Sequence, residues 1–224
     1  MIFVERIRIP RVLIRNGSKW KEEILSAKSK FNSSNNKTDR AILDKALSKY
    51  HHDEIKKSLE LMFYGKCAFC ESYIQNVDFG DIEHFKPKSK FPELAVEWNN
   101  LLLACKKCNG ADQKGDKWPT VEEGGPLINQ CDENPEDFFE FEFDEETLIT
   151  IVKPKNTRAK TSESIYGLNK HSLLGDRNKY IRKLVFIAKR YHVDNEAKEI
   201  IDEALQNKGE YLAFTRMILS KYVE

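Results

Sequence analysis

Four cysteines in two pairs are the first residues whose spacing indicates chemistry. Cys67 and Cys70 form one Cys-x-x-Cys pair, and Cys105 and Cys108 form a second. Two thiolates three positions apart on a tight turn can bind one tetrahedral ion, and two such turns complete a four-cysteine structural zinc site. Reduced core thiols or two disulfides are the alternatives, although disulfides are rare in cytosolic proteins. Cys131 is left over and is assigned to the core or to a surface turn.

Acidic and imidazole side chains lie in the long segment between the two cysteine pairs. Asp81, Glu83 and His84 lie within four consecutive positions, and in a strand Asp81 and Glu83 would share one face. A neutral imidazole, with an ordinary pKa of about 6.5, can take a proton from water, and a carboxylate can bind a hard divalent ion. The combination is typical of metal-assisted hydrolysis. The competing interpretations are a core histidine at His84 and a surface charge at Glu83.

The order of these motifs resembles the HNH, or ββα-metal, nucleases. Residues 64–118 contain, in order, a Cys-x-x-Cys pair, an acidic residue before a histidine, a proline three residues later, Asn-Leu, and a second pair followed by Asn and a downstream Lys. The surrounding phrases narrow the resemblance to the Septu-type PtuB proteins of bacterial anti-phage systems, including the retron-linked ones. These phrases are IEHFKPKS, WNNLLLACKKCN, GGPLINQCDENPEDFFEF and TSESIYGLN, and the similarity covers most of residues 64–177.

The resemblance implies a role for each motif residue. His84 would be the general base that activates water for phosphodiester hydrolysis, and Asn100 would tie down the adjoining loop and orient His84. Glu83 and Asn109 would bind the catalytic Mg²⁺ or Mn²⁺, with Gln113 as a further ligand one helical turn after Asn109. Structural zinc would hold together a ββα unit that is too small to be stable by burial alone. The resemblance also implies a partner, an ABC-type ATPase similar to PtuA.

Positive charge is concentrated toward the C-terminal end, although the formal net charge is only +1, and the lysines around the site are accompanied by about as many acids. Residues 153–192 include 11 basic and 2 acidic side chains, a local excess that could supply a phosphate-binding face. Solvated helix faces are the alternative interpretation. Contacts to nucleic acid, DNA or RNA, are predicted for five lysines: Lys86, Lys88, Lys106, Lys107 and Lys114.

The elements that must position these residues indicate an α+β fold, with a small zinc-stapled ββα-metal core embedded in a mostly helical chain. We expect a short strand at 1–9, a helix capped by Ser18, helical spacing over 39–63 with an interruption near 51–53, and four helical segments after 157. The predicted regions are 1–63 (strand and helices), 64–120 (HNH core), 121–152 (acidic hairpin-like segment) and 153–224 (basic helices).

Two further classes of function stay open. One is a non-catalytic zinc-stabilised module that binds nucleic acid or protein, and the other is an adaptor that docks to a larger machine. The Glu83–His84 pair favours an enzyme, because a binding module needs no base. The chain has no uninterrupted apolar run of about 18 residues and no signal-peptide pattern, so we expect no membrane span and a cytoplasmic location.

Overall fold

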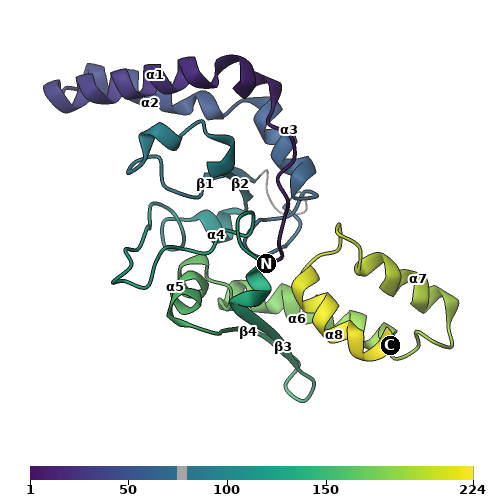
Figure 1. Cartoon of the computed structure of the whole chain (residues 1–224). Helices are drawn as coiled ribbons and strands as arrows, with labels where there is room; N and C mark the ends of the chain where they lie inside the picture. Colours follow the sequence, from purple (N-terminus) through teal and green to yellow (C-terminus); the bar gives the residue numbers. More distant parts are fainter. Residues whose placement is uncertain (75–79, 224) are drawn as a thin grey trace.

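The computed structural model describes residues 1–74 and 80–223, in which a small two-stranded core lies between two helical regions (Figure 1). One region is formed by α1, α2 and α3, and the other contains a β-hairpin and helices α5 to α8 (Figure 1). The predicted fold class is confirmed, because the described residues combine helices with two separate two-stranded sheets. The four region boundaries stay predictions.

The N-terminal helices form an arm that reaches away from the core. The long helix α1 (Arg11–Ser34) begins directly after Pro10, earlier than the predicted cap at Ser18, because a fixed proline φ suits a helix start. Asn35 adopts a left-handed conformation between α1 and α2 (Lys37–Leu47). The short helix η1 (Ser48–Tyr50) and α3 (Asp53–Met62) follow, so the predicted interruption near 51–53 is confirmed.

The prediction of a strand at 1–9 is wrong. The segment is extended and partly buried, but it is not part of a sheet. The Val4 amide donates to the Gln130 carbonyl at 2.9 Å. The alternation of apolar residues therefore reflects packing of one side of this segment against the core, without the ladder of hydrogen bonds that a strand would form.

The central core consists of two antiparallel strands and a short helix. Strand β1 (Asp81–His84) pairs with β2 (Leu101–Ala104), with Glu83 opposite Leu102 and His84 opposite Leu101. All four residues of β2 are buried, and helix α4 (Lys106–Asn109) follows directly. The connection between the strands contains two single turns, η2 (Pro92–Leu94) and η3 (Trp98–Asn100). This arrangement is the expected ββα order.

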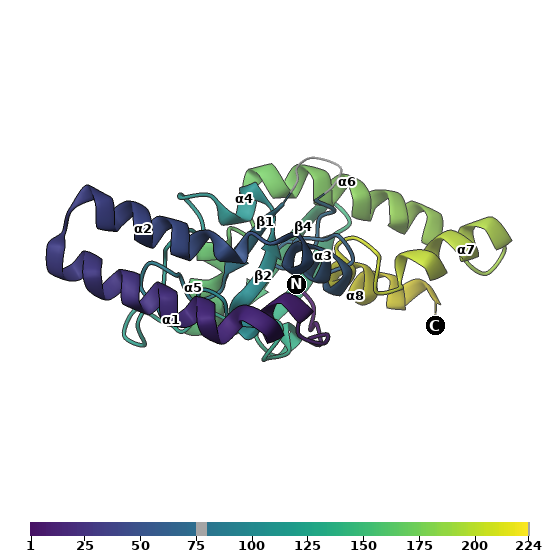
Figure 2. The same ribbon diagram turned by 90° about the horizontal axis from the view of Figure 1, so that it is seen from above.

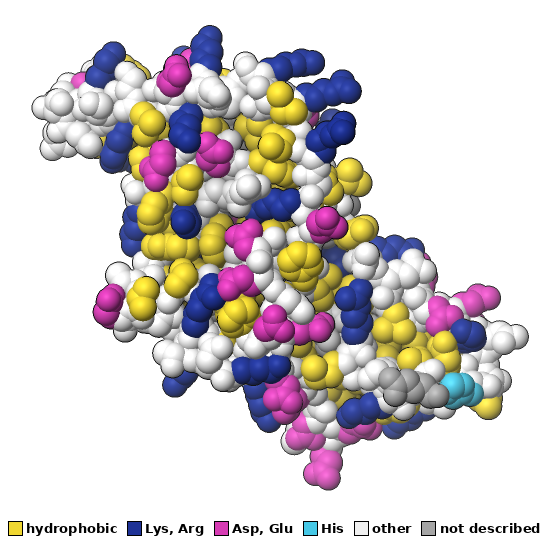
Figure 3. All heavy atoms as spheres, viewed as in Figure 1, with side chains coloured by type: hydrophobic (Ala, Val, Ile, Leu, Met, Phe, Trp, Pro, Cys, Tyr) yellow, Lys and Arg dark blue, Asp and Glu magenta, His cyan; other side chains and the backbone are white. Residues whose placement is uncertain are grey.

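The C-terminal half begins with η4 (Pro135–Asp137) and a hairpin of β3 (Phe139–Asp144) and β4 (Ile149–Pro154). Its turn carries exposed acidic side chains, which gather at the lower tip of the molecule (Figure 3). Four helices follow: α5 (Thr157–Tyr166), α6 (His171–Ala188), α7 (Asn195–Ala204) and α8 (Leu212–Val223). None of the helices that the structure describes is long and apolar enough to cross a membrane.

Tyr166 joins this half to the core, and Arg177 changes the interpretation of the basic segment. The Tyr166 ring stacks on Phe69, next to the first cysteine pair, with ring centroids 4.3 Å apart. Arg177 is 2% exposed, and its guanidinium donates to Thr150 Oγ1 at 2.7 Å and to the Leu168 carbonyl at 2.8 Å. Arg177 therefore stabilises the fold and does not contribute to a phosphate-binding face.

Candidate catalytic and metal-binding site

The four paired cysteines form one buried cluster, with all of their Sγ atoms within 4.8 Å of one another. Sγ of Cys70 and Sγ of Cys105 are 3.8 Å apart, and an ideal tetrahedral site with Zn–S bonds of about 2.3 Å has S···S edges of about 3.8 Å. Hydrogen bonds from the neighbouring thiols, Cys105 first, lower the pKa of Cys70. The four cysteines are thus positioned to bind a metal ion. All five cysteines are free thiols, and Cys131 is buried outside the cluster.

His84 lies at the end of β1 and is 3% exposed. Its Nε2 is 2.9 Å from the Ala95 carbonyl oxygen, which can only accept, so Nε2 carries the hydrogen and Nδ1 is the acceptor. The Tyr50 ring from η1 packs edge-on against the imidazole, with centroids 4.4 Å apart. Burial lowers the pKa of His84 to about 3, so the imidazole is neutral at physiological pH.

Asn100 fastens the loop on both sides of the imidazole. Its Oδ1 accepts from the Lys86 amide at 2.8 Å, and its Nδ2 donates to the carbonyls of Lys86 at 3.0 Å and Leu94 at 3.1 Å. Lys86 lies two residues after His84, and Leu94 directly precedes Ala95, whose carbonyl holds the ring. The side chain of Asn100 therefore fixes both the backbone that carries His84 and the acceptor that orients it.

Glu83 is buried and forms an ion pair with Lys114, whose side chain has no exposed surface. The ammonium of Lys114 donates to Glu83 Oε1 at 2.8 Å and to the His84 carbonyl at 3.0 Å. Burial raises the pKa of Glu83, and the Lys114 charge opposes that shift. Lys114 was predicted to contact nucleic acid, but its ammonium is enclosed in the protein and is not available to a phosphate in this structure.

Oxygen-bearing side chains from β1 and α4 meet beside this pair. Asp81 shares a strand face with Glu83, because side chains alternate along β1. Asn109, the last residue of α4, donates from Nδ2 to Asp81 Oδ2 at 3.3 Å. The Asp81 carboxylate and the Asn109 amide are thus brought together from segments far apart in the sequence, and Glu83 lies on the same strand face as Asp81.

Gln113 does not lie where helical spacing placed it. Helix α4 ends at Asn109, and Gly110 leaves the helical conformation with φ −58° and ψ 160°, so Gln113 is not one turn further along the same helix. Its Nε2 donates to the Asp112 carbonyl at 3.0 Å, and its buried Oε1 has no hydrogen-bond partner among the described residues. That Oε1 lies against Gly167 at the end of α5, where an added Cβ would approach it to 2.0 Å.

The remaining predicted lysines lie on two sides of the site. Lys88 donates to Tyr50 Oη at 3.2 Å, above the ring that covers His84, and the ammonium of Lys86 lies over the rings of Phe91 and Trp118. Lys106 and Lys107 are exposed at the beginning of α4.

Three contributions to the site were missed by sequence reasoning. These are the Ala95 carbonyl, the Tyr50 ring and the buried role of Lys114. A backbone carbonyl leaves no signal in the residue type, and Tyr50 lies 34 positions before His84 in the chain. The sequence motif includes a downstream lysine, but the burial of Lys114 depends on a partner 31 residues away.

Comparisons with known proteins support the HNH resemblance. Residues 67–115 match the HNH endonuclease family. Two similar proteins are named Septu protein PtuB: that of Bacillus mycoides (strain KBAB4) is 28% identical, covering 70% of this chain and 65% of the relative, and that of Bacillus thuringiensis is 33% identical, covering 58% and 46%. A protein of Vibrio cholerae serotype O1 biovar El Tor, named as a retron HNH endonuclease, is 30% identical, covering 55% and 61%. The matches thus span about half to two thirds of the relatives' length.

Proposed function

We propose that this protein is a metal-dependent endonuclease that hydrolyses phosphodiester bonds of nucleic acid. One observation carries the proposal: His84 is a neutral imidazole of fixed tautomer next to Glu83, within the segment that matches the HNH family. In this proposal His84 Nδ1 accepts the proton of the attacking water, and the bond from Nε2 to the Ala95 carbonyl keeps the ring in orientation. Asn100 acts through the loop as a positioning residue.

Three residues of β1 and α4 offer ligands that fit a hard divalent ion, Mg²⁺ or Mn²⁺. Asp81, Glu83 and Asn109 offer carboxylate and amide oxygens, and such ions need only one or two protein oxygens because they retain water ligands. When bound, the ion would stabilise charge on the phosphate and on the leaving oxygen. Glu83 and Asn109 are the proposed ligands, with Asp81 directly beside Asn109. Four sulfur ligands in a tetrahedron fit zinc in the cysteine cluster.

A cleavage assay with matched histidine variants tests the activity. Purified protein is incubated with plasmid DNA and with total RNA, in Mg²⁺ or Mn²⁺ and without added divalent ions. His84→Ala should abolish metal-dependent cutting, while His192→Ala, which removes an exposed histidine, should not change it. Zinc content and circular dichroism on the same samples show that both variants are folded. Cutting that survives in folded His84→Ala overturns the proposed base.

We further propose that the protein works in the bacterial cytoplasm as the nuclease of an anti-phage system, together with an ABC-type ATPase similar to PtuA. The names of the relatives support this proposal. Co-expression with a PtuA-like ATPase from the same organism should give a complex on size exclusion, and His84→Ala should remove phage protection without removing the complex. If the folded protein cuts nothing with or without that ATPase, a non-catalytic zinc-stabilised adaptor becomes the better description.

A further inference from the structure

A hollow of about 520 Å³ lies between the beginning of α4 and the side of α6. Its walls come from the first cysteine turn (Ser72, Tyr73), from Cys105 of the cysteine cluster, from Lys106 and Lys107 on α4, from α6, and from Glu210 and Tyr211 before α8. The volume falls in the range of about 300–1,000 Å³ that is usual for small-molecule sites. The proposed catalytic residues do not line it.

The charge of this α4–α6 hollow favours an anion. Lysines enter it from both helices, namely Lys106, Lys107, Lys179 and Lys183, against two acids, Asp176 and Glu210. Lys107 lies 3.3 Å from Asp176, so these two charges partly cancel. Lys179 and Lys183 are exposed, stand one helical turn apart, and form no ion pair with a residue that the structure describes. Two ammonium groups on one helix face are therefore available to phosphates.

Aromatic rings form the other part of the hollow. Tyr73, Tyr180 and Tyr211 line it, and the rings of Tyr180 and Tyr211 pack at 60° with centroids 5.6 Å apart. All three hydroxyls have partners within the protein: Tyr211 Oη accepts from Ser72 Oγ at 2.9 Å, Tyr73 Oη donates to the Lys208 carbonyl, and the Tyr180 hydroxyl bonds to the Glu210 backbone. Half-buried Tyr180 offers ring surface to a ligand. Rings beside lysines suit a base attached to a phosphate backbone.

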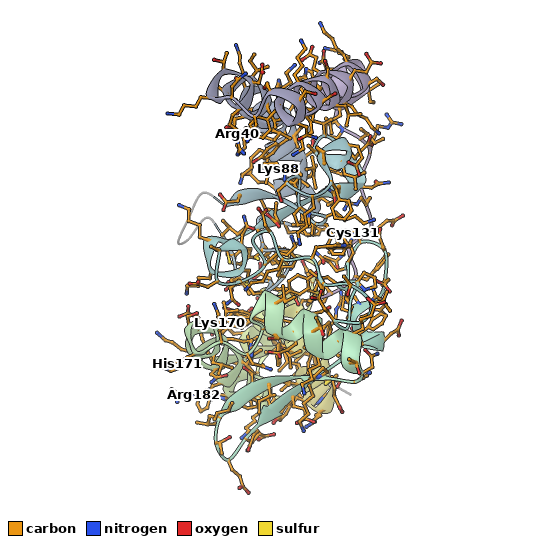
Figure 4. The ribbon with its side chains drawn as sticks, turned by 90° about the vertical axis from the view of Figure 1, so that its left-hand side faces the viewer. Arg40, Lys88, Cys131, Lys170, His171 and Arg182 are labelled. Atoms are coloured by element: carbon orange, nitrogen blue, oxygen red, sulfur yellow. The ribbon has the colours of Figure 1, made fainter. Side chains whose placement is uncertain are left out.

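The hollow lies on the same face as the proposed catalytic site. Helix α4 connects the two, because Lys106 and Lys107 begin it and Asn109 ends it. Seen from above, α2, α4 and α6 run along one edge of the molecule (Figure 2). Arg40, Lys88, Lys170, His171 and Arg182 also lie along one side (Figure 4). A chain of phosphates could thus pass from Lys88, above His84, toward α6 without leaving this face.

We propose that the α4–α6 hollow binds a nucleotide of a single-stranded segment of the nucleic-acid substrate, beyond the cleaved bond. The base lies against Tyr180, and Lys179 and Lys183 bind the adjoining phosphates. A duplex keeps its base faces stacked inside, so only an unpaired nucleotide reaches the rings. The inference rests on the proposed function, because it concerns the path of the same substrate.

Binding without cleavage tests this path. The His84→Ala protein, without added divalent ions, is titrated into fluorescent oligonucleotides about twelve nucleotides long, as single-stranded DNA, single-stranded RNA and a DNA duplex, with anisotropy as the readout. Adding Tyr180→Leu should weaken single-strand binding by about 5-fold to 150-fold, the usual range for one stacked base, while Tyr180→Phe retains affinity. Adding Lys179→Ala with Lys183→Ala should reduce the slope of log K against log salt by about 1.4, or about 0.7 for each phosphate.

The control removes the same charge elsewhere. Lys19→Ala with Lys30→Ala, two exposed positions on α1, should leave affinity and salt slope unchanged. Unchanged single-strand binding in folded Tyr180→Leu, or tighter binding of the duplex than of both single strands, would overturn the proposal that the hollow binds an unpaired nucleotide. Because the binding assay requires no cleavage, a negative result here does not contradict the proposed nuclease activity. In the same way, single-strand binding by a protein that cuts nothing would still support the proposed role of the hollow.

Discussion

The ammonium of Lys114 donates to Glu83 Oε1 at 2.8 Å in a place where the lysine side chain has no exposed surface. Its other two hydrogens go to the carbonyls of His84 and Gly115, at 3.0 and 3.1 Å, so the whole ammonium is satisfied. The amide of Lys114 donates to the Cys108 carbonyl at 3.2 Å. One residue therefore connects the cysteine cluster to the strand that carries Glu83 and His84.

Lys114→Met should destabilise the protein by about 3–5 kcal/mol, because it leaves the Glu83 carboxylate buried without its counter-charge. In the double variant with Glu83→Gln, the loss of unfolding free energy should be smaller than the sum of the two single losses by about 0.5–3 kcal/mol, since both substitutions remove the same interaction. Urea unfolding without added divalent ions measures this. Lys117→Met, at an exposed position of the same loop, should cost no more than about 0.5 kcal/mol. Strict additivity would mean that the pair has no energetic coupling.

The pKa of His84 gives stability a defined pH dependence. Burial lowers it to about 3 from an ordinary 6.5, so below about pH 6.5 the unfolded chain binds a proton that the folded protein does not. His84 therefore lowers the free energy of unfolding as the pH falls from about 6.5 toward 3, by up to about 1.4 kcal/mol per unit. The stability difference between wild type and His84→Asn should shrink by about 2 kcal/mol between pH 7 and pH 5.

Denaturant unfolding at the two pH values measures that difference, with the metal sites in the same state in both proteins. His192→Asn, at an exposed position, controls for the loss of an imidazole that is not buried. A constant gap between wild type and His84→Asn would show that His84 is not held neutral by burial. The same burial predicts that activity shows no titration of His84 between pH 5 and pH 8.

The centre of the fold could be predicted because its signals are local. The two cysteine pairs and the Glu83–His84 motif occupy short segments, and the structure places them in the expected ββα order. The strand prediction at 1–9 failed because alternation records only which residues face the core, not whether a partner strand exists. The sequence does contain a signal against placing Gln113 on α4, since a helix commonly ends at an Asn-Gly pair such as 109–110.

Contacts between distant segments could not be predicted. Nothing near Lys114 in the sequence distinguishes it from the exposed Lys117, and only the folded chain brings its ammonium to Glu83. Arg177 is a similar case, because it sits in a basic stretch yet is buried against Thr150. Counts of lysine and arginine therefore overestimate the charge available to phosphates whenever some of these side chains are buried and paired with acceptors from another element.

Asn100→Ala should cost about 2–4 kcal/mol of stability, because it leaves three backbone groups of the loop without their partner. It should also loosen the Ala95 carbonyl, so that the His84 ring loses its single tautomer. Nitrogen NMR of the imidazole reports the tautomer, and a purely structural role would change stability without changing that signal. Asn99→Ala, whose side chain is exposed, should alter neither quantity.

Removing one cluster thiol should unfold the ββα core, whereas removing the remaining cysteine, Cys131, should not. Cys108→Ser takes away one of four ligands and disturbs the residue whose carbonyl receives the Lys114 amide. Structural zinc contributes about 10–16 kcal/mol of binding free energy in small domains, so its loss exceeds what the ββα unit can tolerate. We expect one zinc per chain in wild type and in Cys131→Ser, and little in Cys108→Ser. Amide exchange in β1 should accelerate only in Cys108→Ser, because β1 is held to the cluster through Lys114. Protected β1 amides in a zinc-free protein would show that burial alone holds the site together.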